Sequence, residues 1–179
     1  LKGLKFGGAQ MLQVAANEAA VISALRGDGH TVSLWFYTTA TGTLYMLYMR
    51  EETTRNFLGI ALISGRVYSY LRKSSVPAYS TATYYNAWTH VCVTRTGQAG
   101  TVNGHKLYIN GVAPSGFLDQ DVEADSAASG AGDALTIGAT AAGGSMFNGM
   151  INDVIIWNTD ITAQQVTALY NAQKAYYEI

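Results

Sequence analysis

Charged side chains are scarce in this chain of 179 residues, where they make up only 13% of the sequence. Soluble domains usually carry roughly 25%. The 11 Lys and Arg nearly balance the 12 Asp and Glu, which leaves a formal net charge of -1. Nucleic-acid binding depends on many cations that neutralise phosphates. The composition therefore argues against a nucleic-acid partner.

Cysteine and long apolar runs are also scarce. The single cysteine, Cys92, excludes a disulfide framework and a cysteine-based zinc cluster. It alternates with valines in a strand-like segment, so we expect a buried, inert thiol. The longest apolar runs, such as Val154–Trp157, fall far short of the roughly 20 residues of a membrane-spanning helix. With 49% hydrophobic residues the chain is not intrinsically disordered.

Strand-forming segments dominate what is present. Runs rich in β-branched and aromatic residues alternate with turn signals such as Ser64-Gly65 and Asn110-Gly111. In the segment 43–49, apolar residues occupy both sets of alternating positions. This pattern predicts a central strand that is covered on both faces. Strands are predicted at 31–37, 43–49, 57–63, 66–71, 88–94, 106–109, 134–138 and 150–157.

One helix is expected near the end of the chain. Thr162 followed by Gln165 fits a capping box, and Val166, Leu169 and Tyr170 then share one helix face. Helices do not alternate with strands, so a parallel α/β sheet is excluded. The sequence predicts a single domain over residues 1–179. Its fold class is all-β, an antiparallel β-sandwich with one short C-terminal helix.

Several short motifs follow one another in a fixed order. They are Trp-Thr-His-Val at 88–91, Lys-Leu-Tyr-Ile-Asn-Gly-Val at 106–112, Leu-Thr-Ile-Gly at 135–138, and the segments 147–158 and 161–166. Together they resemble the laminin-G-like branch of the concanavalin-A-like lectin/glucanase superfamily, over roughly residues 4–172. The resemblance implies a jelly roll with one convex and one concave sheet. Because this fold hosts lectins, adhesion domains, viral attachment domains and glycosidases, function has to be argued from sites.

The carboxylate pattern argues against an enzyme. Glucanases of this superfamily carry Glu-x-Asp-x-x-Glu on one strand, with the two glutamates flanking the glycosidic bond. The nearest segment is Glu123-Ala124-Asp125, and Ala128 stands where the last carboxylate is needed. No histidine pair has metal-ligand spacing, and no serine lies in a nucleophile elbow. His90, within a predicted strand, is expected to be a structural histidine with a satisfied hydrogen bond.

The sequence has more of the residues that a glycan-binding surface needs than of those that a glycosidase needs. Arg66, Tyr68 and Tyr70 share one face of a predicted strand, since strand side chains alternate with period 2. Tyr84 and Tyr85 follow in the chain. We expect these five residues to form part of a concave sugar-binding surface, with aromatic rings against apolar sugar faces. The alternative is that the tyrosines only fill the boundary between sheet and solvent.

The resemblance also implies a structural Ca²⁺. Many family members hold one near the last long strand, at a motif that usually reads Ile-Asp-Asp/Glu-Val. The chain has Asn152 and Asp153 at the two central positions, so one carboxylate is replaced by an amide. Asp28, in the turn before the first long strand, is expected to approach from the other side. These three oxygen-bearing residues are the predicted calcium ligands.

The leading expectation is a non-catalytic, lectin-like carbohydrate-binding module of a larger extracellular protein, with a glycan as its partner. Two alternatives stay open: a structural or host-attachment domain of a viral or phage particle, and a laminin-G-type protein-interaction domain. The chain begins at Leu1 without an initiator Met or a signal pattern, which predicts a processed product or part of a longer, multidomain or virion protein. These three functions predict an extracellular, secreted or virion-associated location, and they allow a homo-oligomer.

Overall fold

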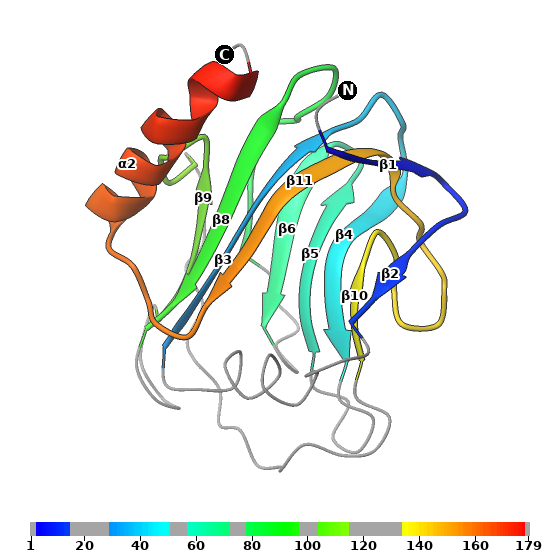
Figure 1. Ribbon diagram of the computed structural model, residues 1–179, viewed down its shortest axis with the longest axis horizontal. Coiled ribbons are helices and arrows are strands. Elements are labelled where there is room, and N and C mark those ends of the chain that lie inside the picture. Colours follow the sequence, from blue (N-terminus) through cyan, green and yellow to red (C-terminus); the bar gives the residue numbers. More distant parts are fainter. Residues whose placement is uncertain are drawn as a thin grey trace.

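The computed structural model describes residues 3–14, 29–50, 57–71, 78–96, 104–114 and 134–177. Two antiparallel sheets lie face to face, and one helix runs along the outer side of one of them (Figure 1). The strands are β1 (Leu4–Gly7), β2 (Leu12–Gln13), β3 (His30–Tyr37), β4 (Thr43–Arg50), β5 (Phe57–Ile63), β6 (Arg66–Leu71), β7 (Ala78–Tyr79), β8 (Thr89–Arg95), β9 (His105–Ile109), β10 (Ala134–Ile137) and β11 (Asn148–Trp157). The helices are α2 (Ala163–Gln173) and the short 3₁₀ helix η1 (Lys174–Tyr177).

The strand order is that of a two-sheet sandwich. One sheet has five strands in the order β1-β11-β3-β8-β9, and the other has six in the order β2-β10-β4-β5-β6-β7. The predicted all-β antiparallel sandwich is confirmed, and each of the eight predicted strands forms with ends shifted by at most two residues. The strands β1, β2 and β7 were not predicted, and β2 and β7 have only two residues each, too few to show a period.

Alternating apolar residues fill the space between the sheets. On β3 the inward side chains are Val32, Leu34 and Phe36, and all three are fully buried. On β5 they are Leu58, Ile60 and Leu62, at most 1% exposed. These two sets belong to one hydrophobic core that both sheets share. Because side chains alternate along a strand, this pattern also determines which residues of each strand point to the outer face of its sheet.

A β-bulge in β4 changes the outer face of the six-stranded sheet. Tyr45 pairs with Ala61 and Leu47 pairs with Ile60, so Met46 is the extra residue. Tyr45 and Tyr48 are three positions apart, yet the bulge turns both to the outer face, where they are partly exposed. The expectation that this strand is covered on both faces is therefore wrong. Its place in the middle of a sheet, between β10 and β5, is confirmed.

The helix α2 lies against the outer face of the five-stranded sheet. Its N-terminus has the predicted capping box, in which the Gln165 amide donates to Thr162 Oγ1 at 3.3 Å and the Thr162 amide donates to Gln165 Oε1 at 2.8 Å. Val166 is fully buried against Cys92 and Tyr108 of the sheet. The thiol of Cys92 is buried as expected, and burial raises its pKa to about 12.

Trp35 anchors the end of the chain on this same face. Its ring, on β3, is fully buried and stacks on Tyr177 of η1 with centroids 4.0 Å apart. Its Nε1 donates a hydrogen bond to Gln173 Oε1 at 2.9 Å. The C-terminal helices therefore occupy the outer face of the five-stranded sheet. Among the described residues no helix covers the outer face of the six-stranded sheet.

Two buried histidines bond to serines. The Nε2 atom of His105 and the hydroxyl of Ser69 lie 2.9 Å apart and join β9 of one sheet to β6 of the other. The Nε2 atom of His90 lies 2.8 Å from the hydroxyl of Ser33, which confirms the expected hydrogen bond, although its Nδ1 has no hydrogen-bond partner in the described part of the chain. Burial lowers the pKa of both imidazoles to about 4.

Gly138 offers a test of the packing at the edge of the sandwich. A Cβ at this position would lie 2.5 Å from ring atoms of Phe6, and the backbone φ is 87°. We expect Gly138→Ala to lower the free energy of unfolding by about 2 kcal/mol or more, because it adds a clash to the strain of a left-handed backbone. Denaturant titration measures the effect. Gly143→Ala is the control: its φ is 73° but its Cβ would make only an ordinary 3.6 Å contact. An equal loss in both variants would contradict the clash.

The histidines predict a pH dependence of stability. Both are neutral when folded down to about pH 4, whereas an unfolded histidine titrates near 6.5. Between these values the unfolded chain binds more protons, so the histidine contribution is fully present above about pH 6.5 and falls as the pH approaches 4. Urea midpoints should decrease from pH 6.5 to 5, and His105→Gln, which keeps a donor for Ser69, should reduce that slope. A slope unchanged in both His105→Gln and His90→Gln would contradict this assignment.

Candidate functional site

Five tyrosines lie together on the outer face of the six-stranded sheet. Strand pairing places them in two rows: one crosses β4, β5, β6 and β7, and the other crosses β4, β5 and β6. All five side chains are partly exposed. This set is called the tyrosine face and consists of Tyr45, Tyr48, Tyr68, Tyr70 and Tyr79.

The tyrosine face is built over the smallest residues of β5. In one row Ala61 pairs with Tyr45 on one side and Tyr68 on the other. In the next row Gly59 lies between Tyr48 and Tyr70 in the same way. Both small residues are buried although they belong to the outer face. Side chains of the neighbouring strands therefore cover the middle strand, and across it Tyr45 lies close enough to Tyr70 to affect the pKa of Tyr70.

Ring contacts fix the geometry of this surface. Tyr68 stacks on Tyr70 with centroids 6.1 Å apart and on Tyr79 with centroids 5.3 Å apart, and both interplanar angles are below 20°. Tyr45 and Tyr48 meet edge to face at 5.3 Å. Stacked and T-shaped pairs of this kind are favourable beyond simple burial. The rings are thus held in place by one another.

Two hydroxyl groups of the surface, those of Tyr45 and Tyr70, have raised pKa values. Burial, followed by the neighbouring hydroxyls of Tyr45 and Tyr68, raises the pKa of Tyr70 to about 12. Burial also raises the pKa of Tyr45, with a smaller effect from Tyr48. A protonated phenol donates one hydrogen bond and accepts others. The surface therefore offers aromatic rings together with neutral donors and acceptors.

Arg66 lies at the end of this face. It is the first residue of β6, it points to the same side as Tyr68, and it is exposed. It forms no ion pair with any residue in the described segments. A guanidinium donates hydrogen bonds to acidic and hydroxyl-bearing groups, and this one stands at the end of the β6 side-chain row that contains Tyr68 and Tyr70.

Tyr84 and Tyr85 occupy a different environment. Both are partly buried and pack against the hydrophobic core. The ring of Tyr85 fills the space where a side chain on Gly65 would lie, and the Tyr84 amide donates to the Gly65 carbonyl at 2.8 Å. Burial raises the pKa of Tyr84. They thus flank the β5–β6 turn next to Arg66, and their contact with a ligand stays a prediction.

Sequence reasoning found part of the face. It placed Arg66, Tyr68 and Tyr70 on one side of a strand, and the structure has them there. It did not include Tyr45 and Tyr48, because an odd spacing in a regular strand points to opposite faces. Only the bulge at Met46 brings them to one side.

Two of the three predicted calcium ligands, Asn152 and Asp153, are bonded to Tyr177. Asn152 Nδ2 donates to the Tyr177 hydroxyl at 2.7 Å, and that hydroxyl donates to Asp153 Oδ2 at 2.8 Å. Asp153 has a φ of 47°, at the irregular point of β11. Burial, together with Asp153, raises the pKa of Tyr177. Both side chains therefore hold η1 against the sheet.

These residues alone do not fit a calcium ion, which takes six to eight oxygen ligands. The described segments contain no group of three or more His, Cys, Asp or Glu side chains arranged to hold a metal. Asp28, the third expected ligand, lies outside the described residues. The Glu123–Asp125 segment, considered and rejected above as a catalytic pair, lies outside them as well. The calcium site stays a prediction that depends on Asp28.

A chelator tests the calcium prediction. If Asp28 completes a site with Asn152 and Asp153, EDTA should lower the melting temperature and added Ca²⁺ should restore it, because an ion that binds only the folded chain stabilises it. Differential scanning calorimetry measures the shift, and Asp28→Ala should abolish the response. Gln10→Ala, which removes an exposed amide oxygen that accepts a hydrogen bond from the Gly7 amide, is the control. A melting temperature that EDTA leaves unchanged would contradict a structural ion.

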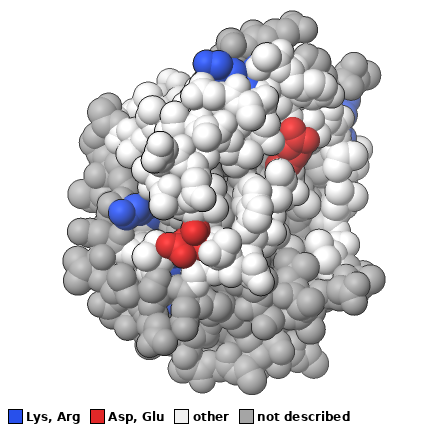
Figure 2. Space-filling view, turned by 60° about the vertical axis from the view of Figure 1, so that its left-hand side comes forward, with Lys and Arg blue, Asp and Glu red and all other residues white. Residues whose placement is uncertain are grey.

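The surface reflects the low charge of the sequence. Figure 2 shows the side that carries α2, where a few separate blue and red groups lie in a largely uncharged surface. No basic stripe of the kind that binds nucleic acids appears among the atoms described on this face. In the described part of the chain, no helix has the length and apolarity to cross a bilayer.

The chain belongs to the Concanavalin A-like lectin/glucanases superfamily, whose family model matches residues 6–167. The resemblance seen in the sequence is thereby confirmed. No curated protein sequence matches the chain at the significance required.

Solved structures share the fold at low sequence identity. The chain is 15% identical to the CBM40 module of the Ruminococcus gnavus IT-sialidase, with a TM-score of 0.72 and coverage of 95% of this chain and 97% of that one. It is 18% identical to the heptameric SAP-like pentraxin of Limulus polyphemus, with a TM-score of 0.66 and coverage of 93% and 80%. A Trypanosoma rangeli sialidase matches at 14% identity and a TM-score of 0.69, over 97% of this chain and 28% of that one. These likenesses show a common fold.

Proposed function

We propose that this protein is a non-catalytic, lectin-like carbohydrate-binding module that binds its glycan on the tyrosine face. The observation that carries the proposal is the placement of five partly exposed tyrosines side by side on an outer sheet surface, over Gly59 and Ala61. Tyrosines that only stabilise the fold can be buried. Five partly exposed rings leave an unusually large apolar area in contact with water, which is typical of a binding surface.

The chemistry of the face suits sugars. A pyranose ring has an apolar side formed by C–H groups, which packs on aromatic rings, and hydroxyl groups around its edge. The protonated hydroxyls of residues such as Tyr70 supply hydrogen bonds to that edge. Arg66, exposed at the end of the face, favours glycans with acidic or bidentate acceptor groups. The face has no described nucleophile or carboxylate pair that would cleave the bound sugar.

Similar structures support this class of function. Among them is the R. gnavus CBM40 module bound to α2,6 sialyllactose, which matches at 14% identity and a TM-score of 0.74 over 95% of this chain and 97% of that one. That protein is a carbohydrate-binding module of the same size and fold. We infer a glycan partner for this chain too, and we propose an extracellular or secreted setting as part of a larger protein, since modules of this kind act where glycans are displayed.

Removing the stacked tyrosines tests the proposal. In the double variant Tyr68→Ala and Tyr70→Ala we expect glycan affinity to fall at least tenfold, because each ring supplies stacking area and a hydroxyl. A glycan array with and without Ca²⁺ identifies a ligand, and titration calorimetry measures the loss. The control is Tyr176→Ala, which removes a tyrosine that is 54% exposed on η1.

The outcomes separate the alternatives. Unchanged affinity in a double variant that keeps its melting temperature would exclude the tyrosine face as the site. A wild-type chain that binds no glycan but forms a stable homotrimer would favour the structural or host-attachment role instead. Binding to a specific protein in the absence of any glycan affinity would favour the laminin-G-type interaction role.

A further inference from the structure

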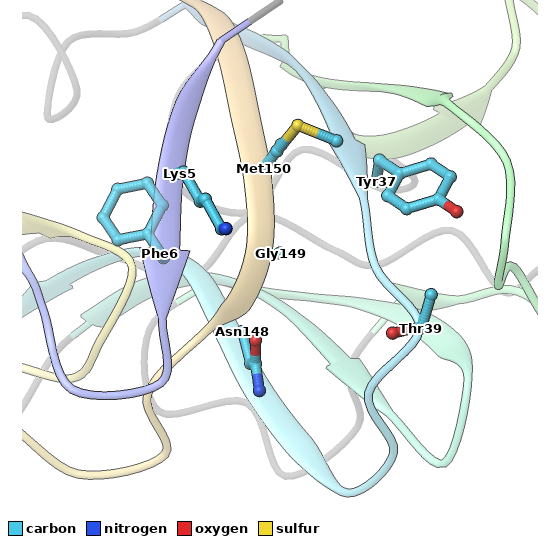
Figure 3. Close-up of a pocket in the computed structure, with 7 residues that line it drawn as sticks. All are labelled: Lys5, Phe6, Tyr37, Thr39, Asn148, Gly149 and Met150. Atoms are coloured by element: carbon cyan, nitrogen blue, oxygen red, sulfur yellow. The ribbon is translucent and has the colours of Figure 1, made fainter. Parts of the chain in front are cut away.

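A hollow lies on the other sheet, away from the tyrosine face. It is a cavity of about 260 Å³ on the five-stranded sheet, where β1, β11 and the end of β3 meet (Figure 3). It is lined by Lys5, Phe6, Tyr37, Thr39, Asn148, Gly149 and Met150. The volume is somewhat below the range of drug-sized pockets and suits a single small ring.

The hollow lies beside a row of side chains that crosses three strands. Lys5, Met150 and Tyr37 form one row across the three strands, because Lys5 pairs with Met150 and Met150 pairs with Tyr37. Gly149, between Asn148 and Met150, also lines the hollow and cannot carry a side chain, since a Cβ there would collide with the Tyr37 carbonyl oxygen. A glycine is therefore required at this point of the lining.

One wall of the cavity is aromatic and held in place. The ring of Tyr37 lies 6.0 Å from that of Trp88, and Trp88 in turn lies 4.8 Å from Tyr177 of η1. Met150 adds an apolar, adaptable surface beside Tyr37. A ligand that enters thus meets an apolar wall whose position does not depend on the ligand.

Three further lining residues, Lys5, Thr39 and Asn148, are polar and exposed. Lys5 and Asn148 stand on one side of the hollow and Thr39 on the other, as Figure 3 shows. Lys5 forms no ion pair with any residue of the described ranges. Only 13% of the residues in the chain are charged, and Lys5 is one of the few cations. Its ammonium group stands beside the cavity together with the Asn148 amide. It attracts an anion to this corner.

We propose that the cavity binds one carboxylate-bearing sugar ring, separately from the tyrosine face. The apolar side of the ring packs on Tyr37 and Met150, the carboxylate pairs with Lys5, and the hydroxyls bond to Asn148 and Thr39. A bare inorganic anion would use Lys5 and leave the apolar wall unoccupied. A neutral sugar would use the wall and leave the cation unpaired. An acidic sugar uses both.

NMR titration with three probes tests the site. D-glucuronate should produce saturable shifts of the Lys5, Gly149 and Met150 amide signals. D-glucose, matched in ring size, should bind at least fivefold more weakly, and inorganic phosphate at the same ionic strength should give no saturable shift. Lys5→Gln should weaken glucuronate binding about tenfold, the usual effect of losing a charge-assisted hydrogen bond. Lys106→Gln, on β9 of the same sheet, should leave it unchanged.

Each other result overturns the proposal. Equal affinity for glucuronate and glucose would mean that Lys5 does not select an acid, and phosphate shifts at the same amides would mean a simple anion site. The absence of saturable shifts for glucuronate would exclude a site. Because the double variant at Tyr68 and Tyr70 should leave these shifts unchanged, failure here and failure of the tyrosine face are distinguishable.

Discussion

The stacking of Tyr177 on Trp35 determines which surfaces of the sandwich are free. Each sheet has an inner face in the shared core and an outer face that must be covered or solvated. The Trp35 ring and its hydrogen bond to Gln173 hold the C-terminal helices on the five-stranded sheet. The hydroxyl of Tyr177, bonded to Asn152 and Asp153, secures the same end. The outer face of the six-stranded sheet is left without a described helix over it, and there the chain places its partly exposed tyrosines.

The tyrosine face depends in turn on two local features of neighbouring strands. The bulge at Met46 brings Tyr45 and Tyr48 to one side of β4, and the small residues Gly59 and Ala61 on β5 are covered by side chains of the neighbouring strands. A larger residue on β5 would separate the two groups of rings. Because bulges commonly re-aim side chains beside functional sites, the irregularity of β4 is better understood as part of the surface than as a defect of the strand.

The sequence allowed the fold to be predicted almost completely, because period 2, turn signals and a capping box are local patterns. Arg66, Tyr68 and Tyr70 were placed on one face by the same local argument. The rest depended on contacts between distant segments. Tyr45 and Tyr48 required a bulge, which leaves no mark in the alternation of residue types. Asn152 and Asp153 look like metal ligands in their motif, yet their partner Tyr177 lies more than twenty residues further along the chain. The cavity beside Lys5 joins strands from both ends of the sequence, so no local pattern reveals it.

The two proposed sites use the scarce charges of the chain in a similar way. Arg66 and Lys5 are exposed cations without an ion pair in the segments that the structure describes, and each stands beside tyrosine rings on a different sheet. Since the sites lie on opposite outer faces of one sandwich, a single sugar ring cannot reach both. A flat glycan layer meets only one outer face at a time, so effective concentration does not link the two contacts. Each cation therefore serves the site on its own sheet, and the two proposed sites are expected to fill independently.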